Sequence, residues 1–369
     1  MHAAARPTRQ QRVRFAATLT IGALLLCLLA ACAPASTSRA PVASGKPQTV
    51  AELAQYRGAD RQQLLEERAR QEGGPVVIYS SGTIMKPLLD ALEKKYPFFK
   101  AQIIAADSTA ISRRVVEEYK AARYDVDGFE LSIQGLLIPA EQDVLQSYYS
   151  PELSHYPDSV KQHQGYWTII RASYIGLGYN TSRVTAQEVP KGFRDLADPK
   201  WRGRMAVSNS LGTGANWVGT ILQRETEDFV RSLKSQNFKA IEGSGRVVAD
   251  LIIAGEVDVS PTIYNSHVFD SQKKGAPIAW VPMESNFVTE VTFAMASHAP
   301  HPASTLLLAD FALSREGQEM YKAMGYGSAH DQAQSADMQF EKAYFTSLPD
   351  YEERLDKWSR VFKEVFLTR

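Results

Sequence analysis

Short apolar segments alternate with longer amphipathic ones in this chain, and that alternation limits its fold more than any other feature. Residues 75–81, 101–107 and 126–132 are short and contain apolar runs, the first of them with β-branched side chains, which predicts strands. Residues 82–97 and 108–123 have the apolar spacing of helices. Because strands that alternate with helices of this length form βαβ units, we expect a parallel sheet flanked by helices.

The same alternation returns after residue 173. Segments 174–180, 204–209 and 257–262 are expected strands, and segments 214–225 and 246–256 are expected helices. The chain exceeds the ~250–300 residues at which a single hydrophobic core stops growing. We therefore expect an α/β fold with two lobes, each a sheet flanked by helices, and a ligand cleft between the lobes.

The first 31 residues have the composition of an export signal. They contain four arginines and no acid, then an apolar run from about Phe15 to Leu29, then small residues. Leu29 to Cys32 resembles a bacterial lipobox, which predicts lipidation of Cys32, and ordinary signal cleavage is the alternative. Residues 32–57 are expected to be a flexible tether because they begin with Pro, Ala and Ser, and residues 58–74 are expected to form a helix.

Cysteine usage and charge argue against several classes of protein. The two cysteines are Cys27, which would leave with the signal, and Cys32, so no disulfide, thiolate metal site or cysteine nucleophile is expected in the rest. Removal of residues 1–31 leaves 37 basic and 41 acidic residues. With that balance and no basic stripe, the sequence does not predict nucleic-acid binding.

Four segments follow predicted strands, and ligands of open parallel sheets lie beyond the carboxyl ends of the strands. These segments are Ser80–Thr83, Glu130–Ser132, Thr213–Asn216 and Pro261–His267. Their side chains are mostly hydroxyl and amide groups. The pattern favours a hinged protein that binds a small solute.

Four segments resemble, in order, motifs of family 1 extracellular solute-binding proteins of bacterial ABC importers. Residues 148–167 resemble the Y-x-SPE segment, 193–205 the DL-x-DP-x-W-x-G segment, and 301–321 the HP-x-x-A…DF-x-LS-x-EGQ helix pair. Residues 254–269 resemble the segment that carries site residues of the second lobe. The likeness covers about residues 75–327 and is greatest to the ferric-ion-binding subgroup.

The resemblance implies a type II periplasmic-binding-protein fold. The first lobe would contain residues 75–170 and about 285–335, and the second would contain about 171–284 and the C-terminal helices of 336–369. The implied protein is a monomer, anchored to a membrane by lipid and exposed outside the cytoplasm. It would close over its ligand and release it to an ABC permease that works with an ATPase.

In the ferric subgroup a histidine, a glutamate, two adjacent tyrosines and an anion hold the metal. Carried over to this sequence, the glutamate is Glu130 and one tyrosine is Tyr264. The second tyrosine position is Asn265, and the histidine position falls near Thr83. Because Fe(III) prefers carboxylate and phenolate oxygens, Glu130 and Tyr264 are the candidate metal ligands, and exogenous ligands would have to complete the shell. No cofactor is expected beyond Fe(III) or a chelated metal as the transported ligand.

A small organic oxyanion, such as a phosphonate, a phosphate ester or a carboxylate, is the alternative ligand. The predicted helix start at residues 213–216 would offer backbone N–H groups to it, and Arg246 would add positive charge. The candidate ligand-binding residues are Ser80, Ser81, Thr83, Glu130, Thr213, Gly214, Ala215, Asn216, Arg246, Tyr264, Asn265 and His267.

Other functional classes have less support in the sequence. No G-x-S-x-G, H-E-x-x-H or Walker motif occurs, so an enzyme is not expected. A binding protein that serves a membrane sensor kinase would need the same closing cleft. That alternative stays open.

Overall fold

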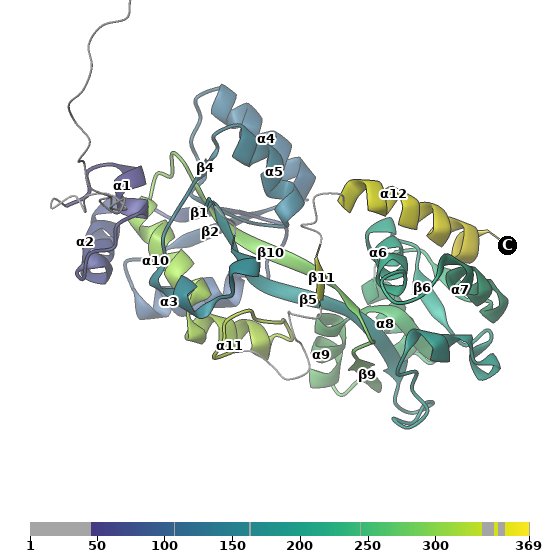
Figure 1. Cartoon of the computed structure of the whole chain (residues 1–369). Helices are drawn as coiled ribbons and strands as arrows, with labels where there is room; N and C mark the ends of the chain where they lie inside the picture. The colour runs from purple at the N-terminus through teal and green to yellow at the C-terminus, as the bar shows by residue number, and fades with distance from the viewer. Residues whose placement is uncertain are drawn as a thin grey trace, which may run out of the picture. The chain divides into compact units, whose positions relative to one another are not determined.

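The fold starts from three parallel strands linked by helices. β1 (Val76–Ser80) pairs in parallel with β2 (Ala101–Ala105) and β3 (Gly128–Leu131) in the computed structural model of the chain. α3 (Lys86–Lys95) and α4 (Ser108–Lys120) connect them. The order of strands and helices is the predicted one (Figure 1).

The structure describes residues 46–106, 108–161, 164–243, 245–333, 343–345 and 351–368. The predicted signal peptide, Cys32 and the first part of the predicted tether lie outside those residues. The end of the tether differs from the prediction, because Val50–Ala54 form helix α1 and bury Leu53 and Ala54 in a hydrophobic core. Thr49 and Glu52 form the capping box that starts this helix. Among the described residues, no helix is both long and apolar enough to cross a membrane.

Only part of the main sheet is parallel, which corrects the prediction. β10 (Asn286–Ala296) lies antiparallel to β3 and to β5 (Trp167–Asn180), and β5 lies antiparallel to β8 (Val259–Tyr264) and β9 (Ile278–Val281). The short strands β4 (Leu145–Gln146) and β11 (Ala343–Phe345) also pair with β10. A strand buried on both faces is continuously apolar, and that pattern does not reveal its direction.

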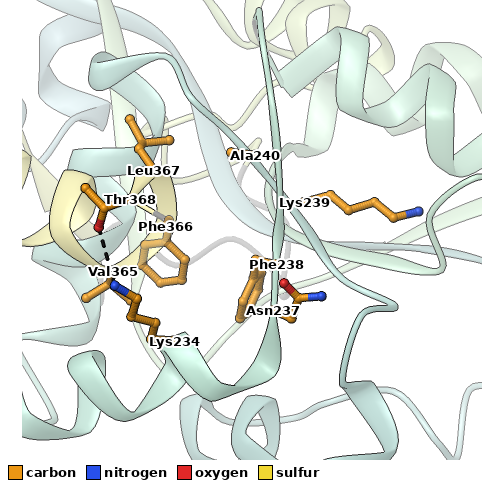
Figure 2. Close-up of a pocket in the computed structure, with 9 residues that line it drawn as sticks. All are labelled: Lys234, Asn237, Phe238, Lys239, Ala240, Val365, Phe366, Leu367 and Thr368. Atoms are coloured by element: carbon orange, nitrogen blue, oxygen red, sulfur yellow. Dashed lines mark hydrogen bonds between the residues drawn. The ribbon is translucent and has the colours of Figure 1, made fainter.

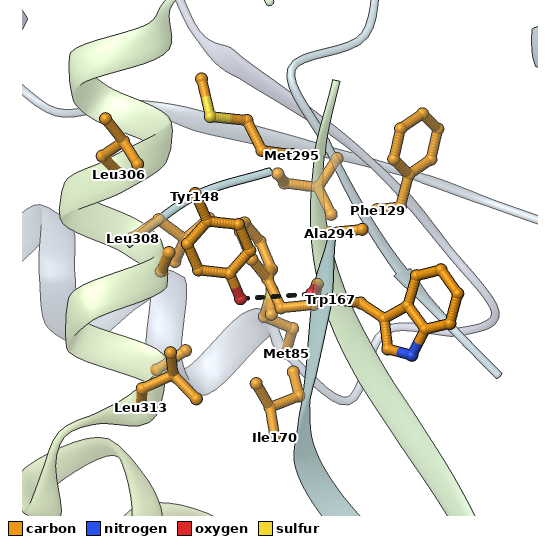
Figure 3. Packing of buried hydrophobic residues seen from close by; sticks show 14 of the residues in the cluster. Met85, Phe129, Tyr148, Trp167, Ile170, Ala294, Met295, Leu306, Leu308 and Leu313 are labelled. Carbon is orange, nitrogen blue, oxygen red and sulfur yellow. Dashed lines mark hydrogen bonds between the residues drawn. The ribbon is translucent and has the colours of Figure 1, made fainter. Parts of the chain in front are cut away.

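One hydrophobic core surrounds β1, β3, β10 and the first half of β5, and we call the elements around it the first lobe. Figure 3 shows Tyr148 of this core beside α10 (Pro302–Leu313), with the Tyr148 hydroxyl donating to the Phe293 carbonyl at 3.3 Å. The other helices of the first lobe are α2 (Arg61–Glu72), α5 (Ile133–Glu141), α11 (Arg315–Ala323) and the 3-10 helices Pro151–His155 and Asp158–Val160.

Two further clusters of buried residues form the second lobe, around the parallel pair β6 (Ala206–Ser208) and β7 (Lys239–Ile241). Its helices are α6 (Leu211–Ile221), α7 (Glu227–Ser232), α8 (Gly245–Ile253), α9 (Asn265–Lys273), α12 (Tyr351–Phe362), the π-helical turn Lys363–Leu367, and the 3-10 helices Phe193–Ala197, Pro199–Trp201 and Leu233–Gln236.

β5 is shared between the two lobes. Tyr174 belongs to the first core, whereas Leu177 and Tyr179 belong to the second. In a strand of this length, side chains of both cores therefore sit on one rigid backbone. Residues that lie near the middle of β5 are placed between the two lobes.

Candidate functional site

Three helices of the second lobe begin at one edge of its sheet. β6 and β7 are parallel, and a parallel bridge between Met205 and Val259 gives β8 the same direction. α6, α8 and α9 follow these strands within four residues. Because each helix N-terminus carries unsatisfied N–H groups and a partial positive charge, this edge favours an anion.

The connections before these helices are bonded to one another. The Gly243 N–H donates to Asn209 Oδ1 at 3.3 Å, and the Ser208 hydroxyl donates to the Gly243 carbonyl at 2.6 Å. The Ser208 N–H donates to Thr262 Oγ1 at 3.0 Å. The loops after β6 and β7 and the end of β8 therefore form one rigid group.

Tyr264 is the last residue of β8, and its hydroxyl lies 3.2 Å from Thr289 Oγ1 of β10. Burial raises the pKa of Tyr264, against the opposite effect of hydrogen bonds with Thr289 and Thr213. The phenol thus keeps its proton at neutral pH. The hydroxyl can therefore donate a hydrogen bond to a ligand.

His267 lies in the first turn of α9, where the sequence had suggested a loop. Its ring meets the Tyr264 ring edge-on at 5.3 Å between centroids, and Arg246 Nη1 donates to its carbonyl at 3.3 Å. The pKa of His267 is lowered to about 4, first by burial and then by the charge of Arg246. Arg246 itself also pairs with Asp250 at 3.2 Å.

At the end of β3 in the first lobe, Glu130 is fully buried and already paired. It accepts hydrogen bonds from the Ser80 hydroxyl and from Arg171 Nε, the latter at 2.9 Å. The Arg171 guanidinium lies 4.8 Å from the centre of the Tyr326 ring, and Tyr326 is in turn hydrogen-bonded to Ser266 of α9. We call Arg171, Glu130 and Tyr326 the inner triad.

Arg171 and Tyr326 were not among the candidates, although one sequence signal pointed to the first. Arg171 is the one charged residue in the fourteen residues of β5. A charge in a strand that is otherwise uncharged is rarely buried unless it is paired or functional. No comparable signal marks Tyr326, because its place depends on how the chain returns after α11.

Several predicted site residues serve the fold instead. α6 begins at Leu211, so Gly214, Ala215 and Asn216 lie inside it and their N–H groups belong to its ladder. A Cβ on Gly214 would lie 2.4 Å from the Phe362 ring, and Ala215 is part of the second core. The N–H groups that begin the helix are those of the residues before Thr213, which is two residues earlier than predicted.

Asn265 also has a structural role. Its Oδ1 accepts from the Tyr174 N–H at 2.9 Å, and its Nδ2 donates to the Gly325 carbonyl at 2.6 Å. Thr213 is buried and lies near Tyr264. Ser81 and Thr83 are exposed in the turn that follows β1.

Two other features lie apart from this site. Within the described part of the chain, His155, His330 and Asp331 form the one His, Cys, Asp and Glu cluster of metal-binding spacing, and it includes neither Glu130 nor His267. A cavity of about 670 Å³ lies where β7 begins, and its lining includes Phe238, Phe366, Lys234 and Lys239 (Figure 2). The carboxyl ends of the strands lie at the other end of β7.

Comparison with known proteins identifies the family of this chain. The sequence matches the family described as bacterial extracellular solute-binding protein over residues 138–352. The Fe(3+)-binding periplasmic protein of Serratia marcescens is 26% identical over 207 residues, which are 54% of this chain and 60% of that protein.

Two solved structures share the fold. Iron-bound HitA from Pseudomonas aeruginosa has 20% identity and a TM-score of 0.62, and AfuA from Actinobacillus pleuropneumoniae with exogenous fructose-6-phosphate has 21% and 0.58. Each similarity covers 79% of this chain and 99% of the other. The predicted two-lobed periplasmic-binding-protein fold is thereby confirmed. Because the family match spans more than half of its residues, the chain belongs to the bacterial extracellular solute-binding protein family.

Proposed function

We propose that this protein captures a small organic oxyanion, such as a phosphate ester or a carboxylate, and delivers it to an ABC importer. The observation that carries the proposal is the donor set at the middle of β5. Three helix N-termini, the protonated Tyr264 hydroxyl and the Arg171 guanidinium are all donors, and a set of donors matches the acceptor oxygens of an anion.

Fe(III) is the second candidate ligand, favoured by the Serratia marcescens relative and by HitA, whose names state that they bind iron. Against it, Arg171 neutralises Glu130, and burial opposes deprotonation of Tyr264. An Fe(III) site needs negative oxygen ligands in number. Iron could reach this site only as a chelate whose own oxygens face the donors.

AfuA supports the choice of a phosphate ester as the first probe, since its structure contains fructose-6-phosphate. Delivery would follow closure of the lobes about β5 and β10, with preference of the ligand for the closed state driving the change. Lipidation at Cys32 would anchor the protein to a membrane outside the cytoplasm. A sensor kinase would be the receiving partner in the alternative.

Native mass spectrometry with metal analysis of the full-length protein in mild detergent tests the proposal. We expect metal-free protein, with a small organic anion either co-purified or bound after addition of fructose 6-phosphate or citrate. Stoichiometric iron that persists after dialysis against phosphate would contradict it. A neighbouring permease gene would favour import, and a neighbouring kinase gene would favour sensing.

A further inference from the structure

Arg171 is a buried cation that has more hydrogen-bond donors than protein acceptors. Its side chain is 8% exposed, and Glu130, which it contacts, is 0% exposed. A guanidinium has five N–H donors. Within the described part of the chain, the hydrogen bond that Arg171 makes is the one from Nε to Glu130 Oε1 at 2.9 Å.

The two terminal nitrogens of Arg171 therefore have no acceptor among the described residues. Neither Nη atom is among the polar atoms that are both unpaired and fully enclosed, so each keeps some contact with solvent. Buried donors in native proteins are nearly always satisfied, and an unpaired set needs an explanation. A ligand that accepts from these two solvent-accessible nitrogens is one such explanation.

Glu130 and Tyr326 hold this arginine in place. Glu130 binds Nε, which fixes the plane of the guanidinium, and the Tyr326 ring lies 4.8 Å from its carbon. The edge formed by Nη1 and Nη2 is left for a partner. Two parallel N–H groups on that edge match two oxygens of one carboxylate or phosphate.

Arg171 lies on the same face of the sheet as Tyr264. In β5 the side chains of residues 171, 173 and 175 point to one face, and Ile175 is opposite Tyr264 while Ser173 is opposite Thr289. Four residues of strand place Arg171 about 13 Å along β5 from Ile175, the residue opposite Tyr264. A solute with an anionic group at one end and hydroxyl groups at the other would span that distance.

We propose that Arg171 is the residue that anchors the anionic group of the solute, through bidentate hydrogen bonds from Nη1 and Nη2. Glu130 and Tyr326 are positioning residues that orient the fork. Glu130 is thus not a metal ligand, and Arg246, which the sequence suggested as the charged contact, is not the anchor. This inference rests on the proposed function, because it assigns the group that selects an oxyanion.

Isothermal titration calorimetry of the full-length protein in detergent tests the inference, with fructose 6-phosphate, inorganic phosphate and citrate as probes. The variants are Arg171→Lys and the double variant Glu130→Gln/Arg171→Met, which removes both charges together so that no buried charge is left alone. Arg114→Met is the matched control. Arg114 Nε also bonds a glutamate, Glu118, at 2.7 Å, and also lies over a tyrosine, 4.6 Å from the Tyr79 ring, but its side chain is 48% exposed on α4.

We expect at least one probe to bind wild type, with a loss of at least about 100-fold in the double variant and about 10-fold in Arg171→Lys. Arg114→Met should bind as wild type does. Binding within threefold of wild type in both Arg171 variants, with circular dichroism showing that they are folded, would overturn the role of Arg171 and leave the proposed function standing. Failure of wild type to bind any of the three probes would overturn the proposed function itself.

Discussion

Two clusters of the same three residue types occur in different places of the first lobe. The inner triad joins Arg171, Glu130 and Tyr326, and the outer triad joins Arg114, Glu118 and Tyr79. The distances nearly coincide, at 2.9 and 2.7 Å between Nε and the carboxylate and at 4.8 and 4.6 Å from the ring. Yet the arginine side chain is 8% exposed in one and 48% exposed in the other.

That difference in exposure decides what each arginine does. Water can satisfy the terminal nitrogens of Arg114, so the outer triad is complete without a ligand. The terminal nitrogens of Arg171 have little access to water, so the inner triad is complete only when another acceptor arrives. The donors of an ion pair that have no acceptor in the protein thus indicate whether the pair can bind a ligand.

The largest expected contrast between the triads is in stability. Arg171→Met should lower the free energy of unfolding by about 3–5 kcal/mol, because Glu130 stays buried without its counter-charge. Arg114→Met should lower it by about 1 kcal/mol or less, because Arg114 is half-exposed and the buried Glu118 keeps the Tyr79 hydroxyl and Arg123 as partners. Urea unfolding at pH 7 measures both losses. Equal losses would contradict the claim that the two triads differ.

The two triads should also differ in how much a bound anion stabilises the protein when each is altered. Fructose 6-phosphate at about 100 times its dissociation constant should stabilise wild type and Arg114→Met by about 2.7 kcal/mol. It should leave the double variant Glu130→Gln/Arg171→Met unchanged. Unfolding by urea with and without the sugar phosphate gives the comparison, and equal stabilisation of the double variant would move the anion away from the inner triad.

In the second lobe, His267 should make the free energy of unfolding depend on pH. Its folded pKa of about 4 lies below its ordinary 6.5, so between these values the unfolded chain binds the proton and the folded protein does not. The stabilisation from the neutral ring is then complete above pH 6.5 and falls as pH drops toward 4, by about 3 kcal/mol. The charge of Arg246 lowers the pKa of His267 further, and the charges of Asp250 and Asp270 raise it.

The check is the difference between wild type and His267→Gln in urea unfolding at pH 7 and pH 4.5. The variant should lose less stability than wild type over this interval. A larger or equal loss in the variant would show that other groups carry the pH dependence.

The smallest expected effect concerns the ring of the inner triad. Tyr326→Leu should weaken binding of the anion about threefold to tenfold, because it removes a cation–π contact of about 1 kcal/mol and loosens the arginine. Tyr326→Phe keeps the ring and should bind nearly as wild type does. Calorimetry on both variants would separate the ring from the hydroxyl, and an equal loss in both would assign the effect to the bond with Ser266.

The sequence predicted the element order and the two-lobed fold, because strand and helix periodicities are local properties. It did not predict that β10 and β5 lie antiparallel to the first strands, since direction depends on where a distant segment returns. The tether prediction failed at Val50–Ala54 for a similar reason. Two apolar side chains and a capping box gain their stability only from the core that covers them.

For the site, residues at strand ends were predictable and their partners were not. Tyr264 is the last residue of β8 and lies near Thr213, whereas Glu130 lies inside β3, one residue before its end. Gly214 was a false candidate because glycine also marks a close helix contact, in this case with Phe362. The neutralisation of Glu130 required knowledge that residue 171, distant in sequence, reaches it across the sheet.

A crystal structure of the protein grown with fructose 6-phosphate would test the choice between an oxyanion and iron most directly. We predict two phosphate oxygens within hydrogen-bond distance of Arg171 Nη1 and Nη2, with Nε still bonded to Glu130 and the Tyr264 hydroxyl donating to the sugar. A metal held between Glu130 and Tyr264, with Arg171 turned away from the carboxylate, would contradict it.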